Sequence, residues 1–262
     1  MEYIIVALVA MLVAALTLFS GFGLGTLLMP VMAIFFPVEI AIAATAIVHL
    51  ANNIFKGVLV GRNADLKVLF IFALPAVLAA FPGALLLRAL SGMNPWVSWY
   101  AGAHTFNITP VNLIVAILMV IFAVIELLPY FEKMTIGRRW LPLGGVLSGF
   151  FGGISGHQGA LRSAFLSKSG LSREGFIGTS VMTAIMVDIS RIVVYGTAFF
   201  SNETAMLDEP GMKGVLICGI LAAFTGSYTG TRLVKKVTMR HIQLIVGVML
   251  LLLAVALGSG II

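Results

Sequence analysis

Two long apolar blocks, each interrupted by glycines, constrain the fold of this chain more than any other feature. Residues 3–36 are almost wholly apolar but are cut by Ser20-Gly-Phe-Gly-Leu-Gly25, and residues 140–167 are cut by Gly152-Gly-Ile-Ser-Gly-His-Gln-Gly159. Backbone groups freed by such a break cannot face lipid, so they must line a cavity or bind something. Paired interrupted segments in two halves of a chain are typical of the binding site of a secondary transporter.

The composition predicts an all-α polytopic membrane protein. The chain has 262 residues, of which 60% are hydrophobic and only 10% are charged, whereas a soluble domain normally carries about 25% charged residues. No linker or soluble domain interrupts it, so we expect one membrane transport domain over residues 1–262. We interpret residues 1–20 as the first helix rather than a signal peptide, because Glu2 stands where a positive charge is expected.

Six further apolar segments are each long enough to cross about 30 Å of hydrocarbon. They cover residues 40–60, 66–88, 106–128, 174–200, 213–234 and 241–258. The loop at 89–105 holds Trp96, Trp99 and Tyr100, which suit the membrane interface. Basic residues gather near residues 62–67, 133–139, 168–173 and 232–240, and such loops mark the cytoplasmic side.

Following these charges along the chain predicts an inverted-topology repeat. The block at 140–167 begins and ends on the cytoplasmic side, and the block at 3–36 is expected to begin and end outside. Each block is then a hairpin of two short helices, followed by three crossings, with repeat 1 at residues 1–128 and repeat 2 at 140–262. Both termini are expected outside the cytoplasm. An offset of 135 residues aligns Asn53 with Asp188 and Lys56 with Arg191.

Several polar residues inside the apolar segments are candidates for a binding site. Asp188 and Arg191 are three residues apart on one helix face and could form a structural ion pair, or Arg191 could supply positive potential together with Lys56. Lys56 could instead extend its side chain to the cytoplasmic surface. Asn52 and Asn53 could bond a neighbouring helix or donate amide hydrogens to an oxyanion.

The second break has the composition of an anion cradle. His157 and Gln158 lie within the break, Gly159 begins the next helix, and Arg162 follows within that helix. A helix N-terminus carries partial positive charge and unpaired amides. The first break would provide an uncharged second half, formed by Gly23, Gly25 and Thr26. Tight helix crossing is the alternative explanation for the glycines.

Other classes of function find little support in the sequence. Neither the metalloprotease, nucleophile-elbow nor phosphate-loop motif occurs, and no basic groove with interleaved aromatics indicates nucleic-acid binding. The single Cys218 excludes a disulfide within the chain and a thiolate metal cluster. We expect no cofactor, no metal and no enzyme, with a small anion and the lipid bilayer as partners. A homodimer is left open.

The quoted motifs resemble those of the sulfite exporter TauE/SafE family of membrane permeases. The resemblance depends on Ser20-Gly-Phe-Gly-Leu-Gly-Thr-Leu-Leu-Met-Pro30, Asn52-Asn-Ile-Phe-Lys56, Gly153-Ile-Ser-Gly-His-Gln-Gly-Ala-Leu-Arg-Ser-Ala-Phe165 and Val187-Asp-Ile-Ser-Arg191. It implies a multi-pass transporter of the bacterial inner membrane that moves sulfite or organosulfonates. His157, Gln158 and Arg162 stand where many members have glycines and a proline, which bears on the substrate. A passive anion channel and an intramembrane enzyme using Ser155 and His157 are the alternatives.

Overall fold

The chain folds into a bundle of long helices that surrounds shorter ones. The computed structural model describes residues 1–17, 24–102, 104–128, 137–199, 210–233 and 239–262. The first half comprises α1 (Glu2–Thr17), α2 (Leu24–Ala33), α3 (Val38–Val60), α4 (Leu66–Leu90) and α5 (Pro110–Leu127). The second half comprises α7 (Leu141–Ser155), α8 (Gly159–Leu166), α9 (Arg173–Phe199), α10 (Met212–Leu233) and α11 (Met239–Gly258). Short 3-10 turns lie at Gly61–Asn63 and Arg138–Trp140.

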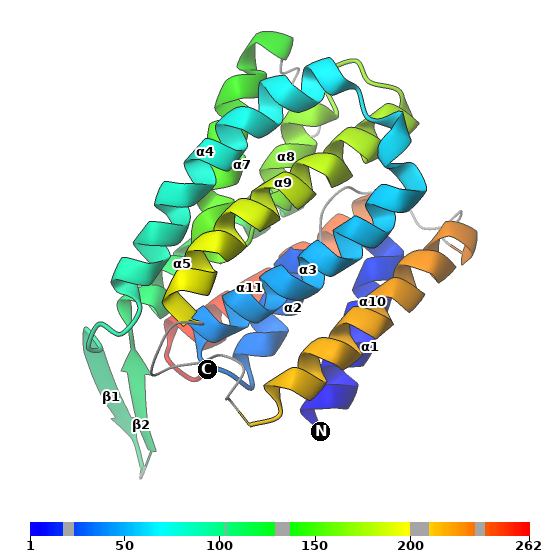
Figure 1. Ribbon diagram of the computed structural model, residues 1–262. Helices are drawn as coiled ribbons and strands as arrows, with labels where there is room; N and C mark the ends of the chain where they lie inside the picture. Colours follow the sequence, from blue (N-terminus) through cyan, green and yellow to red (C-terminus); the bar gives the residue numbers. More distant parts are fainter. Residues whose placement is uncertain (18–23, 103, 129–136, 200–209, 234–238) are drawn as a thin grey trace.

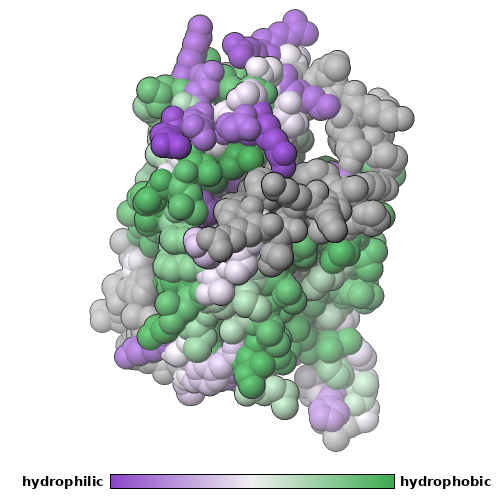
Figure 2. Space-filling model, turned by 90° about the vertical axis from the view of Figure 1, so that its right-hand side faces the viewer, coloured by the Kyte–Doolittle hydropathy of each residue, from purple (hydrophilic) through white to green (hydrophobic). Residues whose placement is uncertain are grey.

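The prediction of an all-α polytopic membrane protein is confirmed. Within the described residues five helices are long and apolar enough to cross a membrane, and they correspond to α3, α4, α5, α9 and α10. The sixth expected span corresponds to α11, whose described apolar part, Gln243–Gly258, is shorter. Large apolar side chains such as Leu78, Leu252 and Val255 are exposed on the outer faces. Figure 2 shows apolar surface over much of the side of the molecule, with hydrophilic residues gathered at one end.

One segment departs from the sequence prediction. Residues 97–108 form an antiparallel hairpin of β1 (Val97–Ala101) and β2 (His104–Ile108), where we expected a loop to 105 and a span from 106. Alternating aromatic and polar residues favour the hairpin, and the cross-strand pair Trp99–Phe106 stacks at 4.5 Å between ring centroids. α5 therefore begins only at Pro110, where the Thr109 hydroxyl accepts a hydrogen bond from the Asn112 amide at 3.1 Å.

The helix–helix contacts between the two halves of the chain are symmetric. α4 packs along α7 and α10 packs along α1, while α3 packs on α9 and α5 packs on α11 (Figure 1). The same pairs result when each helix of the first half is exchanged with its counterpart in the second. The Asn53 amide also donates to Asp188 at 3.4 Å, and these two positions are the ones that the 135-residue offset aligns. These contacts are those that a pseudo-twofold axis between α3 and α9 would produce, and they support the inverted repeat, which stays a prediction.

Glycines on α7 and α10 allow the closest helix contacts. A methyl group at Gly145, Gly149 or Gly153 would lie within 2.4 Å of a backbone carbonyl oxygen of α4. On α10, a methyl group at Gly226 would lie 2.1 Å from the Met11 oxygen of α1. Small residues at four-residue spacing let helix backbones approach in this way inside membranes. Tight packing thus explains these glycines, including Gly153 at the start of the second break.

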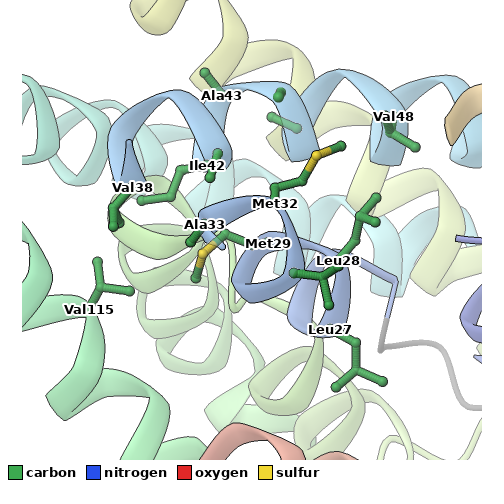
Figure 3. Close-up of a cluster of buried hydrophobic side chains, with 14 of the residues drawn as sticks. Leu27, Leu28, Met29, Met32, Ala33, Val38, Ile42, Ala43, Val48 and Val115 are labelled. Carbon is green, nitrogen blue, oxygen red and sulfur yellow. The ribbon is translucent and has the colours of Figure 1, made fainter. Parts of the chain in front are cut away.

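The first broken block contains a helix that is enclosed on all sides. All ten residues of α2 are buried. Its side chains Leu28, Met29 and Met32 lie among residues of α3 and α5, as Figure 3 shows. A ten-residue helix is too short to cross a bilayer. Its enclosure by longer helices is what a discontinuous helix inside a membrane requires.

The basic loops lie at one end of the bundle, and the two termini lie toward the other end. Arg138 donates to the Ser169 carbonyl at 2.6 Å, and the Asp65 amide donates to the Thr179 hydroxyl at 3.0 Å, so three basic connections meet at one end. At the other end the Trp99 indole donates to the Ser259 carbonyl at 2.7 Å. Both termini lie toward that second end (Figure 1). The positive-inside rule therefore still predicts termini outside the cytoplasm.

This topology can be checked by cysteine labelling. In a variant whose Cys218 is replaced by serine, a cysteine at the exposed Ser172 should react only with a reagent that reaches the cytoplasm. A cysteine at the exposed Ser98, in β1, should react with an impermeant reagent added outside. Labelling of both positions from the same side would contradict the two-ended arrangement, and reversed labelling would contradict the predicted orientation.

The packing role of the α7 glycines gives a second test. Gly149→Ala would place a methyl group 1.9 Å from the Ala76 oxygen, and forcing α4 and α7 apart should destabilise the protein by about 1–3 kcal/mol. Thermal unfolding of the purified protein measures the effect. Gly137→Ala is the matched control, because nothing lies within 4 Å of the added methyl group there. Equal unfolding temperatures for the two variants would contradict this account of α7.

Candidate functional site

The two chain breaks meet in the interior of the bundle. A methyl group at Gly25, the second residue of α2, would lie 3.5 Å from the Gly156 carbonyl oxygen and 3.5 Å from the His49 ring. Thr26 is buried beside it. Gly23, which was expected at the same site, lies outside the described residues. The start of α2 and the end of α7, far apart in sequence, are therefore neighbours.

The second break has a defined backbone conformation. α7 ends at Ser155 because Gly156 adopts φ +79°, a left-handed conformation that ends helices and favours glycine. α8 then begins at Gly159. The Ser148 hydroxyl donates to the Gln158 carbonyl at 2.8 Å, which fixes the break against α7. The first amides of α8, beginning with Gly159, have no acceptor within their own helix by geometry.

α9 holds the end of α7 in place. The Arg191 guanidinium donates to the Gly152 carbonyl at 3.3 Å, and the Tyr195 hydroxyl donates to the Gly153 carbonyl. Both carbonyls belong to the last turn of α7, where the helix supplies few amide donors. The Gly156 amide also donates to the Gly152 carbonyl at 2.9 Å, so Arg191 adds a second donor there, while Tyr195 bonds the next carbonyl, that of Gly153.

Asp188 lies at the centre of a buried hydrogen-bond network. Its Oδ1 accepts from Arg191 at 2.7 and 3.0 Å and from the Gln158 amide at 2.8 Å. Its Oδ2 lies 2.7 Å from His49 Nδ1 and 3.4 Å from the Asn53 amide nitrogen. Asp188 and Arg191 are fully buried. The expected ion pair is therefore present, and the carboxylate joins α3, α9 and the second break.

Two further cations lie inside the bundle. Lys56 is 5% exposed and Arg162 is 2% exposed, so Lys56 does not extend to the surface. The two charges are near enough to repel each other. The Arg162 Nε donates to the Ser180 hydroxyl at 2.9 Å, which connects α8 to α9. Among the described residues Asp188 forms ion pairs with His49 and Arg191, and neither pair includes Lys56.

The two neighbouring asparagines bond within the protein. Asn53 points at His49 and Asp188. Asn52 satisfies its amide when the nitrogen donates to the Ala223 carbonyl at 3.1 Å and to the Ser227 hydroxyl at 2.7 Å. Its oxygen then accepts from the Lys56 ammonium at 3.3 Å. Asn52 thus orients Lys56, whereas Asn53 orients the acid.

Several buried polar atoms have no protein partner within the part of the chain that the structure describes. They include His157 Nε2, Gln158 Oε1, Thr45 Oγ1 and Thr183 Oγ1. A buried polar atom without a partner costs about 1–3 kcal/mol. Two of these four atoms belong to consecutive residues of the second break. Such atoms are a specific sign that the break is built to contact something besides the protein.

Sequence analysis missed part of this site. His49 was not included among the candidates, yet it contacts Asp188 directly. Ser180 and Tyr195 were also not included. All three lie on the faces of α3 and α9 that carry the other polar residues, so their spacing from Asn53 and Asp188 was an available signal. No group of metal-ligating side chains occurs among the described residues.

An open cavity lies at the end of the bundle that bears the termini. It has a volume of about 310 Å³ and lies between the start of α3, the end of α4 and the start of α5. Glu39, Asn94 and Asn112 contribute its polar groups. None of the predicted site residues lines it, so it is separate from the polar centre around Asp188.

The fold and the site together define a class of protein: a polytopic helical membrane protein whose discontinuous helices meet at a buried polar centre. Comparison with family models identifies the family. Residues 6–257 match the model described as Sulfite exporter TauE/SafE, and the chain belongs to this family. The searches of curated proteins and of solved structures found no match.

The role of Asp188 in holding the site together can be tested by removing its charge. Asp188→Asn would leave Arg191 buried without its counter-ion, and breaking a buried pair from one side costs about 3–5 kcal/mol. Thermal unfolding and the yield of monodisperse protein measure the loss. Glu174→Gln, at the exposed start of α9, is the matched control and should have little effect. The double variant Asp188→Asn/Arg191→Gln should be more stable than Asp188→Asn, and equal stability would contradict the pairing.

Proposed function

We propose that this protein is a secondary transporter that exports small sulfur-containing anions such as sulfite or organosulfonates. The family supports transport of a sulfur anion, since its model is that of a sulfite exporter. One observation assigns the transport site to particular residues: the two breaks meet inside the bundle, beside buried cations. Arg162 and the start of α8 directly follow the second break, and the buried Lys56 is near enough to Arg162 for their charges to interact.

The proposed anion site uses three kinds of positive group. The first amides of α8 would donate to the oxygens of the anion, since they point out of the helix end. Arg162, on the same helix, would add a charge-assisted hydrogen bond, and Lys56 would add a point charge. Gly25 and Thr26 would form the opposite wall, because α2 begins against Gly156. A site lined by cations and backbone amides favours an oxyanion over a neutral or zwitterionic solute.

Asp188 has a different role in this proposal. A carboxylate would repel an anion, but this one is neutralised by Arg191 and accepts donors from three segments. It would therefore position Gln158, His49 and Arg191 rather than contact the substrate. Because Arg191 pairs with Asp188, we assign Lys56 and Arg162 as the cations that would face the anion.

Alternating access is the mechanism that we propose for transport. The exchangeable helix pairs, α4 with α7 and α10 with α1, support two related halves that could rock about the contact of α3 with α9. Substrate would enter from the cytoplasmic end and leave toward the end that carries the open cavity. We infer a location in the bacterial inner membrane with both termini outside the cytoplasm.

The enzyme alternative has weaker support than transport. Ser155 Oγ lies 3.0 Å from His157 Nδ1, but it also donates to the Phe151 carbonyl at 3.0 Å. A serine nucleophile needs a histidine that accepts its proton, with a third group to orient that histidine.

The passive channel is distinguished from a coupled transporter by its anion flux. In proteoliposomes, the flux through a coupled transporter should respond to an imposed proton gradient, whereas the flux through a channel should not.

Arg162 tests the proposed site directly. Arg162→Ala should weaken binding of sulfite or sulfoacetate by about 1.5–3 kcal/mol, the scale of a charge-assisted hydrogen bond. Isothermal titration of folded, purified protein measures the change. Arg139→Ala removes an exposed arginine that stacks on Trp140 and is the matched control. Unchanged affinity in folded Arg162→Ala protein would remove Arg162 from the site, and loss of all folded protein would make it structural.

A further inference from the structure

The hydrogen bonds around His157 determine which of its ring nitrogens carries the proton. A serine hydroxyl has a single proton to donate. Ser155 donates that proton to the Phe151 carbonyl at 3.0 Å, so toward His157 Nδ1, also at 3.0 Å, it acts as the acceptor. Nδ1 therefore carries the hydrogen of the neutral ring. The other nitrogen, Nε2, then bears a lone pair.

That lone pair is buried and has no donor among the described residues. The next residue presents a similar atom: Gln158 directs its amide nitrogen at Asp188 at 2.8 Å, which leaves Oε1 as a second buried acceptor without a donor. The ring is also held in place, since Phe122 of α5 stacks parallel to it at 5.7 Å between centroids. The break thus presents acceptors at a position where an anion would bring further acceptors.

An anion and a neutral His157 are electrostatically mismatched, because both present lone pairs. Uptake of one proton at Nε2 removes the mismatch: the lone pair forms an N–H bond with a proton from solvent, and the new donor can bond an oxygen of the anion. A negative charge nearby in turn favours the protonated ring. Anion and proton would therefore bind together and leave together.

Other titratable groups around the break are less suited to this task. Asp188 already accepts donors on both carboxylate oxygens, and His49 already bonds Asp188 through Nδ1. α2 and α7 carry no ionisable side chain. The buried charged or titratable groups on the elements around His157 are His49 and Lys56 of α3, Glu126 of α5, Arg162 of α8, and Asp188, Arg191 and Tyr195 of α9.

We propose that His157 is the proton-coupling residue of this transporter and takes up one proton on Nε2 with each anion bound. The proposal rests on the anion site put forward above. It makes the transported unit an anion together with a proton, so that one negative charge of the substrate is neutralised during transport. It also assigns a role to a residue that occupies the break itself rather than a membrane-spanning helix.

Titration calorimetry of the purified full-length protein with sulfoacetate tests this directly. Sulfoacetate does not titrate between about pH 6 and 8, because a carboxylate titrates near 4 and a sulfonate lower still. Measuring the binding heat in two buffers of different ionisation enthalpy gives the number of protons taken up. The wild type should take up close to one proton per anion at pH values where His157 is neutral in the free protein and protonated in the complex. At higher pH, where His157 is neutral in both states, uptake should cease. Across the range of uptake, the affinity should fall by up to tenfold for each unit that the pH rises.

The variants His157→Gln and His157→Asn should bind without proton uptake and with affinity that hardly depends on pH. His104→Gln is the matched control, because His104 is exposed in β2, and it should behave as the wild type. Each other outcome has a distinct meaning. Wild-type protein that binds no sulfoacetate would overturn both the anion site and the coupling. Binding without proton uptake by the wild type, uptake that persists in the variants, or loss of binding at every pH in folded variants would overturn the coupling alone.

Discussion

The buried carboxylate of Asp188 is the interaction on which the rest of this structure depends. A charged group inside a membrane protein is stable only when partners replace its hydration. Here those partners come from three places: Arg191 on the same helix, His49 and Asn53 on α3, and Gln158 in the second break. Satisfying one charge therefore fixes the relative positions of two long helices and of the chain break between two short ones.

The breaks can exist because other groups satisfy the backbone that they expose. α7 ends in a left-handed glycine, and its last carbonyls accept from Arg191 and Tyr195. α2, at ten residues, is enclosed by longer helices rather than exposed to lipid. Short helices whose ends meet inside a bundle direct amides and polar side chains into one place without any lipid contact. The proposed anion site depends on that arrangement, because free charge is costly at this depth.

Glycine serves two separate purposes in the chain, and the structure distinguishes them. On α7 and α10 the glycines face backbone atoms of α4 and α1, where even one added methyl group would overlap a carbonyl. Gly156, by contrast, is required by its backbone conformation, and Gly25 lies in ordinary contact distance of the second break. Glycine composition alone could not separate close packing from chain reversal, because both appear in sequence as a small residue in an apolar run.

The sequence alone determined the class of fold, the helical segments and most of the polar candidates, because lipid permits few kinds of spanning structure and makes an isolated charge conspicuous. It did not predict the hairpin at 97–108, since a short pair of strands outside the membrane depends on local cross-strand contacts. Only the tertiary structure decided that Gly25 meets Gly156, that His49 bonds Asp188, and that Gln158 turns its amide toward the acid. Those outcomes depend on the packing of α3 against α9, two helices that lie about half the chain apart in sequence. The periodicity of a single segment carries no information about which segment it packs against.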